Sequence, residues 1–424
     1  MIERYSVSII CFSIAIICLL YVWIKKRDFF QPVVVYIFAQ SVTMGIAYFK
    51  LLPAMPDLGL ITWMVWIGAM ISFAVGTAVF YAAFYRNHQP IYEFERPSFL
   101  ENYNWKIHFI FSLFLLALYL AGSAIVVSKI GFSFFNIFSG KEASEGANYG
   151  MFGSIAFNSS PLVVLFLSIA AFKSINPHVW IRRFSLAMAL LVPIFGILVY
   201  PGRLALFTSI GGVTIMYNYV KKRIAPGLIV MAAVLAISSF IGIAIAREQY
   251  GSTGVKGMVA RQVATLPYKY IANNYWNLDY GINTPPERQM HRFTYGVDVV
   301  NGPLGLLRFS GAIREMMGWD NEFNKSVEKV GGLNTINYLW ETYKDFGIAG
   351  CILVPFVAAF LMAFMYESVK RRKTPFWWML YGVSLFFVGW SFFITGYKLV
   401  YIWIWVYIIA LSSFCCTKKV KWLK

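Results

Sequence analysis

The chain has 424 residues, of which 59% are hydrophobic and only 13% are charged. This composition excludes a protein that is soluble throughout, because too few polar residues are present to cover its surface. The formal net charge is +18, but more than half of the basic residues lie in short clusters beside apolar segments, where they contact lipid headgroups. We therefore expect membrane lipids as partners and no nucleic acid.

Apolar segments of about the length needed to cross a bilayer follow one another along the chain. We expect eleven transmembrane helices, at 6–24, 31–51, 60–85, 107–129, 154–173, 184–200, 203–220, 227–246, 346–367, 376–395 and 397–415. Helices are expected because a backbone facing lipid must satisfy its own hydrogen bonds, and the ten-residue alternation of a membrane barrel is missing. The sequence thus predicts an all-α polytopic membrane protein, with one transmembrane domain over 1–424.

The basic clusters lie in every second connection, and cytoplasmic connections are the ones that retain Lys and Arg. The clusters are Lys25, Lys26 and Arg27; Arg86, Arg96 and Lys106; Lys173, Arg182 and Arg183; Lys221, Lys222 and Arg223; Lys370, Arg371, Arg372 and Lys373; and Lys418, Lys419, Lys421 and Lys424. This pattern predicts an outer N-terminus, a cytoplasmic C-terminus and a large extracytoplasmic loop, 247–345, between the eighth and ninth helices. The first span has no small-residue cleavage site after it, so we expect it to be retained as a helix.

The sequence lacks the motifs that several classes of enzyme and transporter require. The sequence has no GxxxxGK[ST] phosphate loop, no HExxH helix and no Asp-x-Asp pair. The five cysteines lie within or at the ends of the spans and show neither metal-ligand nor disulfide spacing. We therefore expect no metal, and no nucleotide-driven or nucleotide-sugar reaction.

Two arginines lie at the predicted outer ends of spans. Arg203 follows a Pro-Gly turn between the sixth and seventh spans, and Arg247 ends the eighth. The planar guanidinium group matches phosphate oxygens in a bidentate way, and an Arg at a bilayer boundary is costly unless it meets an anion or water. The pair suits a pyrophosphate carried on a lipid, although each side chain could equally reach ordinary headgroups.

The loop 247–345 carries nearly equal numbers of acidic and basic residues together with many Tyr and Trp. We expect a folded polar segment, with short amphipathic helices at 256–276 and 304–318 lying on the membrane. Aromatic rings stack on the C–H faces of sugars while amides bond the hydroxyls, and the same rings could instead form an interfacial belt. The sugar-binding candidates are Tyr275, Trp276, Asn277, Tyr338 and Trp340.

Three stretches carry a resemblance to a known family: Gly-Arg-Leu-Ala-Leu at 202–206, the span that ends in Arg247, and Asn-Thr-Ile-Asn-Tyr at 334–338 leading into Tyr-Lys-Asp-Phe-Gly-Ile-Ala-Gly at 343–350. Together with the topology, they resemble the Wzy-type repeat-unit polymerases of O-antigen and capsule synthesis, which have the GT-C type of helical architecture. The resemblance implies that oligosaccharide units on undecaprenyl pyrophosphate are polymerised at the periplasmic face of the bacterial inner membrane. It also implies metal-independent transfer, no cofactor beyond the carrier, and a chain-length regulator and a flippase as partners.

The chemistry of such a reaction follows from its leaving group. Breaking the bond between an anomeric carbon and pyrophosphate leaves a dianion, so the protein must stabilise that charge and orient an acceptor hydroxyl. We assign Arg203 and Arg247 to the pyrophosphate. The candidates for a base are His291, Asp279, Glu341 and Asp345, of which His291 is the only histidine of the loop and Asp345 could instead cap the ninth helix.

Two other functions stay open. An O-antigen ligase would share the spans, the paired arginines and the outer loop, but would transfer the glycan to a lipid A core. A flippase or transporter of lipid-linked oligosaccharide is the alternative without chemistry. Transporters usually show internal repeats and charges deep within spans, and neither is evident in this sequence.

Overall fold

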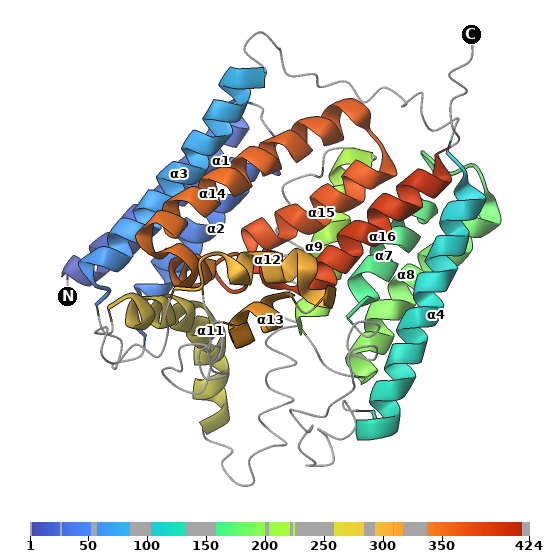
Figure 1. The fold of residues 1–424 in the computed structure, drawn as a ribbon. Helices are drawn as coiled ribbons and strands as arrows, with labels where there is room; N and C mark the ends of the chain where they lie inside the picture. Colours follow the sequence, from blue (N-terminus) through green and yellow to red (C-terminus); the bar gives the residue numbers. More distant parts are fainter. Residues whose placement is uncertain are drawn as a thin grey trace. The chain divides into compact units, whose positions relative to one another are not determined.

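A computed structural model of the chain describes residues 2–25, 28–51, 57–84, 103–132, 158–199, 203–220, 224, 258–283, 293–307, 309–316 and 337–417. Within these ranges the regular secondary structure is helical, apart from one isolated bridge between Tyr103 and Thr417 (Figure 1). The expected all-α class is therefore confirmed for the described part of the chain.

Ten of the predicted spans coincide with helices: α1 (Ile2–Ile24), α2 (Pro32–Ala47), α3 (Leu60–Phe84), α4 (Trp105–Ile130), α7 (Ser160–Ala171), α8 (Val179–Val199), α9 (Arg203–Val220), α14 (Tyr338–Arg372), α15 (Pro375–Gly389) and α16 (Val400–Cys416). The eighth span, 227–246, lies outside the described residues. By length and composition α3, α8, α14 and most of α1 and α4 are able to cross a membrane, and the other five are apolar but shorter. These helices suit a membrane-embedded protein.

The predicted loop 247–345 contains helices in its described parts. They are α11 (Met258–Asn283), α12 (Val297–Leu304), the 3-10 turn η3 (Gly305–Leu307) and α13 (Phe309–Met316). Helices are thus present where the sequence predicted them at 256–276 and 304–318. The first is longer than expected, because the polar and aromatic residues that follow 276 continue the same helix.

The chain forms two compact units. Unit 1 combines Met1–Pro90, Thr265–Glu367 and Phe387–Trp403, and unit 2 combines Ile91–Ala264, Ser368–Phe386 and Ile404–Lys424. In unit 1, α3 and α14 approach closely at small residues, as is common between helices in membranes. A Cβ atom on Gly76 would lie 2.4 Å from the carbonyl oxygen of Phe356, and the Ser72 hydroxyl donates to the Ile352 carbonyl oxygen at 2.5 Å.

In unit 2, α7 is the central helix, and α4, α8 and α9 pack against it. It is apolar on all sides and buried, as such a helix must be. The imidazole of His108 on α4 is fully buried, contacts the Phe166 carbonyl oxygen through Nε2 at 3.0 Å and bonds to the Tyr103 hydroxyl through Nδ1 at 2.8 Å. Because a carbonyl only accepts, Nε2 carries the proton and His108 serves to join α4 to α7.

The helix α14 begins eight residues earlier than the predicted span at 346, because its first turns are too polar to register as membrane-spanning. It is also broken: Phe346 has φ −140° and Gly347 has φ +63°, a left-handed value that favours glycine. The backbone N–H groups of Thr294 and Tyr295 donate to the carbonyl oxygens of Lys344 and Asp345, at 3.1 and 3.0 Å. A segment of the predicted loop therefore pairs with the helix at its break.

The last two spans are shorter than expected and farther apart. We predicted helices at 376–395 and 397–415, whereas α15 ends at Gly389 and α16 begins at Val400. The intervening residues 390–399 form turns and the 3-10 turn η6 (Gly396–Lys398). The small and polar residues Ser391, Thr395 and Gly396 favour turns over helix at this point.

Candidate functional site

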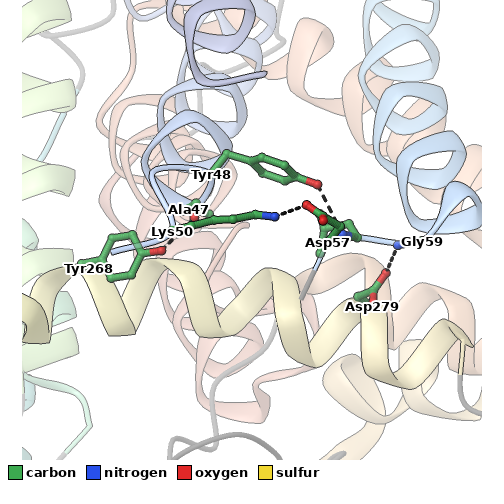
Figure 2. A network of polar contacts seen from close by, with 8 residues as sticks. Ala47, Tyr48, Lys50, Asp57, Gly59, Tyr268 and Asp279 are labelled. Atoms are coloured by element: carbon green, nitrogen blue, oxygen red, sulfur yellow. Dashed lines mark hydrogen bonds and ion pairs between the residues drawn. The ribbon is translucent and has the colours of Figure 1, made fainter. Parts of the chain in front are cut away.

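The first feature of the site is the attachment of α11 to the connection between α2 and α3 (Figure 2). The Tyr268 hydroxyl donates to the Ala47 carbonyl oxygen at 2.9 Å. Toward the other end of α11, one carboxylate oxygen of Asp279 accepts from the Gly59 backbone N–H and from the Thr62 hydroxyl, both at 2.6 Å. The carboxylate thus caps the N-terminus of α3 from a different helix. Bonds from two residues about three turns apart fix α11 across this connection.

Burial changes the chemistry of Tyr268. Its side chain is 4% exposed, and desolvation raises the pKa of its phenol to about 12. The same connection holds an ion pair between Lys50 and Asp57 (Figure 2), and the Tyr48 hydroxyl accepts from the Leu58 backbone N–H at 3.3 Å. The described residues at the two ends of this connection are therefore bonded to each other.

Beneath α11, Gln40 of α2 is the centre of a buried polar network. Its Nε2 donates to the Ser391 hydroxyl at 2.9 Å. Its Oε1 accepts from the Tyr275 hydroxyl at 3.1 Å and from the Trp66 indole N–H at 3.3 Å. Gln40 is fully buried, so this one amide connects α2, α3, α11 and the connection after α15.

The stretch that begins α14 joins the same network. The hydroxyls of Tyr36 and Tyr338 are 2.5 Å apart, and the Tyr338 backbone N–H donates to the Ser391 carbonyl oxygen at 3.0 Å. The Asn337 backbone N–H reaches the Asn274 carbonyl oxygen at 3.5 Å. Segments far apart in the sequence therefore meet at 337–338.

All five predicted sugar-binding side chains are described, and all are buried in unit 1. The exposed fractions are 1% for Tyr275, 7% for Trp276, 1% for Asn277, 6% for Tyr338 and 2% for Trp340. The two tyrosine hydroxyls bond within the protein, and desolvation raises the pKa of Tyr275. The Trp340 ring stacks on Tyr343, with centroids 6.0 Å apart. The four aromatic residues belong to one buried cluster of unit 1, which together with the adjacent buried Asn277 we call the layer, and their binding of sugar stays a prediction.

The predicted bases lie in different surroundings. One carboxylate oxygen of Glu341 bonds to the ammonium groups of Lys344 and Lys398, at 3.0 and 2.7 Å. Asp345 is fully buried, and its carboxylate accepts from the Thr294 hydroxyl. Of these two carboxylates, Glu341 is the one with exposed side-chain surface, 13%. It is therefore the one that a group from outside the protein can reach more directly.

The remaining predicted residues are not placed. His291 and Arg247 lie outside the described residues, and Arg203 is the first residue of α9 with a side chain that is likewise not described. The pairing of the two arginines therefore stays a prediction. Within the described ranges, no three His, Cys, Asp or Glu side chains gather in a way that could hold a metal ion.

Two residues of this region were missed by the sequence reasoning although each left a signal. Gln40 is an amide inside an apolar span, and polar side chains in such positions mark functional or packing sites. Lys398 lies at the start of the predicted span 397–415, beside a connection that the charge rule predicts to be poor in lysine. Thr294, by contrast, left no signal, since hydroxyl residues are common in polar loops.

The chain was compared with known proteins, and no family model, no curated protein and no solved structure matches it.

Proposed function

We propose that this chain is a membrane glycosyltransferase of the Wzy type. In this proposal it polymerises undecaprenyl-pyrophosphate-linked oligosaccharide units into O-antigen or capsular polysaccharide. One observation carries the proposal: the stretch with the strongest family resemblance, in its described part 337–350, is the meeting point of unit 1. It contacts α2 through Tyr338, α11 through Asn337 and the 390–399 connection through Glu341.

The proposed topology has eleven spans, and hydrogen bonds between distant segments support that number. Asp279 bonds to Gly59, so both lie on one side of the membrane. Five described helices separate them, α3, α4, α7, α8 and α9. An odd number of crossings would place the two on opposite sides. The predicted span 227–246, outside the described residues, makes the number even.

A second contact, in unit 2, leads to the same requirement. The Asn104 backbone N–H donates to the Cys416 carbonyl oxygen at 2.8 Å, beside the bridge between Tyr103 and Thr417. Between these two segments the described helices of the predicted spans are α4, α7, α8, α9, α14, α15 and α16. This number is again odd and needs one more crossing. We propose that the α11 side is periplasmic and the C-terminal side cytoplasmic, as the basic clusters indicate.

The proposed chemistry assigns a role to each candidate. Arg203 and Arg247 grip the pyrophosphate and stabilise its developing charge, which requires no proton transfer. Glu341, Asp345 and His291 are the candidates for accepting the proton of the acceptor hydroxyl. We place the sugar on the layer of Tyr275, Trp276, Asn277, Tyr338 and Trp340. Since these rings are buried, they would contact a sugar only after the elements above them move.

The test is the polymerisation reaction itself. Purified protein is incubated with an undecaprenyl-pyrophosphate-linked repeat unit, and a ladder of lengths on a gel is the expected product. Arg203→Lys and Arg247→Lys should each abolish the ladder at unchanged expression, because the charge survives and the bidentate fork does not. Arg183→Lys, the same change on α8, is the matched control and should keep the ladder.

Other outcomes point to the other functions. Glycan joined to a lipid A core without a change in chain length would favour the ligase. Movement of labelled lipid-linked unit across vesicles without lengthening would favour a transporter. An unchanged ladder in either arginine variant would remove that residue from the mechanism.

A further inference from the structure

The segment 293–297 of the predicted loop is attached to α14 at the break in that helix. In a continuous helix the carbonyl oxygens of Lys344 and Asp345 would accept from the N–H groups four residues further on. At the break, the backbone N–H groups of Thr294 and Tyr295 donate to these two oxygens, at 3.1 and 3.0 Å. The Thr294 hydroxyl donates to the Asp345 carboxylate, and both side chains are fully buried. The segment therefore supplies donors that helical residues would otherwise supply.

The attached state has an unfavourable backbone on both sides of the contact. Tyr295 has φ +48°, Gly296 has φ +85° and Gly347 has φ +63°. A left-handed conformation is costly for a residue with a large side chain such as Tyr295, and such conformations cluster at ligand clamps and switch regions. Detachment would allow Tyr295 to leave this conformation and would allow α14 to close its break. The attached state therefore competes with a second arrangement of the same residues.

The same segment lies over the rings that lead to the predicted sugar-binding layer. The Phe293 ring packs edge-on against Tyr343, with centroids 6.3 Å apart, and Tyr343 stacks on Trp340 at 6.0 Å. Phe293 is 42% exposed, Tyr343 is partly buried and Trp340 is 2% exposed. The three rings thus run from the surface into the layer, and Phe293 is the outermost of them.

We propose that the segment 293–297 is a lid that closes the layer and opens for the glycan. In the closed state Thr294 is bonded to Asp345, and Phe293 covers Tyr343. In the open state the segment leaves α14, the helix becomes continuous through its break, and Tyr343 presents its ring to the glycan. The inference rests on the proposed function, in which the layer binds the sugar of a lipid-linked unit.

Two variants should open the lid by different routes. Thr294→Val keeps the shape of the side chain and removes the hydroxyl that bonds to Asp345. Gly347→Ala disfavours the break, because φ +63° is strained for alanine and the new Cβ would lie 3.3 Å from the Phe293 ring.

The measurement is the affinity of the full-length protein, in detergent, for the undecaprenyl-pyrophosphate-linked repeat unit. A ligand that binds only the open state binds more tightly as that state becomes more populated. A hydrogen bond to a charged group and a left-handed alanine are each equivalent to a factor of about ten in such an equilibrium. Each variant should therefore bind the repeat unit about tenfold more tightly than the wild type.

Matched controls separate opening from a general weakening of the fold. Thr294→Ser keeps the hydroxyl and should bind like the wild type. Gly389→Ala on α15 adds a Cβ equally close to a neighbour, 3.3 Å from the Val35 side chain, where the backbone is not left-handed, and should leave the affinity unchanged. Without ligand, the backbone N–H groups of Thr294 and Tyr295 should exchange with deuterium about tenfold faster in both opening variants.

The outcomes distinguish this inference from the proposed function. Weaker or unchanged binding in either opening variant would overturn the lid, even where the wild type forms a ladder. Unchanged exchange at 294–295 would also overturn it. Tighter binding in both variants would support the lid, and if the wild type then formed no ladder, only the polymerase would be overturned.

Discussion

Replacing Asp279 tests how far one carboxylate fixes this end of α11 against the start of α3. One of its oxygens accepts from the Gly59 N–H and the Thr62 hydroxyl at 2.6 Å and from the Asn283 amide at 2.8 Å. Asp279→Ala removes all three bonds and leaves the Gly59 N–H, just before α3, and the Thr62 hydroxyl without this acceptor. Asp279→Asn keeps an acceptor oxygen but not the charge.

The expected magnitude follows from these contacts. A hydrogen bond to a charged group contributes about 1.5–3 kcal/mol and an N-cap about 1 kcal/mol, and the contributions overlap on one oxygen. We expect Asp279→Ala to lower the free energy of local unfolding at the start of α3 by about 3 kcal/mol. Neutral hydrogen bonds are about half as strong as charged ones, so Asp279→Asn should cost about 1.5 kcal/mol.

Hydrogen–deuterium exchange of the peptide containing Gly59 measures this effect directly. An opening free energy lower by about 1.4 kcal/mol speeds exchange about tenfold, so the Asn variant should exchange about tenfold faster and the Ala variant about a hundredfold faster. Glu315→Gln, which removes an exposed carboxylate on α13, should leave the rate unchanged. If Gly59 exchanged equally fast in all four proteins, the capping role of Asp279 would be refuted.

Three further perturbations can be followed by thermal unfolding in one detergent. Gln40→Leu should destabilise unit 1 by about 3 kcal/mol, because it leaves several buried donors and acceptors of the network without their partner; a variant as stable as the wild type would contradict this. Gly76→Ala places a Cβ 2.4 Å from a backbone carbonyl oxygen of α14 and should cost about 2–3 kcal/mol, whereas Gly68→Ala meets only a rotatable side-chain methyl at 2.6 Å and should cost about 1 kcal/mol or less. Equal costs would refute the close approach. The pKa of Tyr268 is raised from 10.0 to about 12, so its contribution to stability is complete below pH 10 and is lost as the pH rises toward 12; Tyr268→Phe should flatten that dependence, and an unaltered profile would contradict it.

The spans were predictable because their signal is local. Ten of them appear as helices, since runs of apolar residues are defined by neighbours in the sequence and need no knowledge of the fold. The errors lie at the ends. The start of α14 was missed because Glu341, Lys344 and Asp345 lower the apolar content of its first turns, while in the fold these side chains are bonded or buried.

The interior of unit 1 was not predictable for the opposite reason. Tyr275 is 235 residues away from Gln40 and Tyr338 is 302 away from Tyr36, and such pairings depend on how helices pack rather than on local pattern. The aromatic and amide residues of α11 were singled out from the sequence, but the same composition suits an open sugar site and a bonded interior. The hydrogen bond from Tyr275 of α11 to Gln40 distinguishes these two possibilities, because it identifies a bonded interior in this structure.

The stretch 337–350 holds unit 1 together and is also part of the proposed site. A variant in it can therefore lose activity for either reason. Tyr338→Phe removes a hydroxyl that lies 2.5 Å from that of Tyr36, so a lost ladder would follow from a weakened fold as readily as from lost sugar binding. Trp276 provides the contrast, since packing is the contribution of its ring and Trp276→Phe keeps an aromatic face. If the layer binds sugar, Trp276→Phe should raise the substrate concentration needed for half-maximal ladder formation, measured well below the temperature at which the variant unfolds. Lower thermal stability with an unchanged half-maximal concentration would assign the layer to the fold alone.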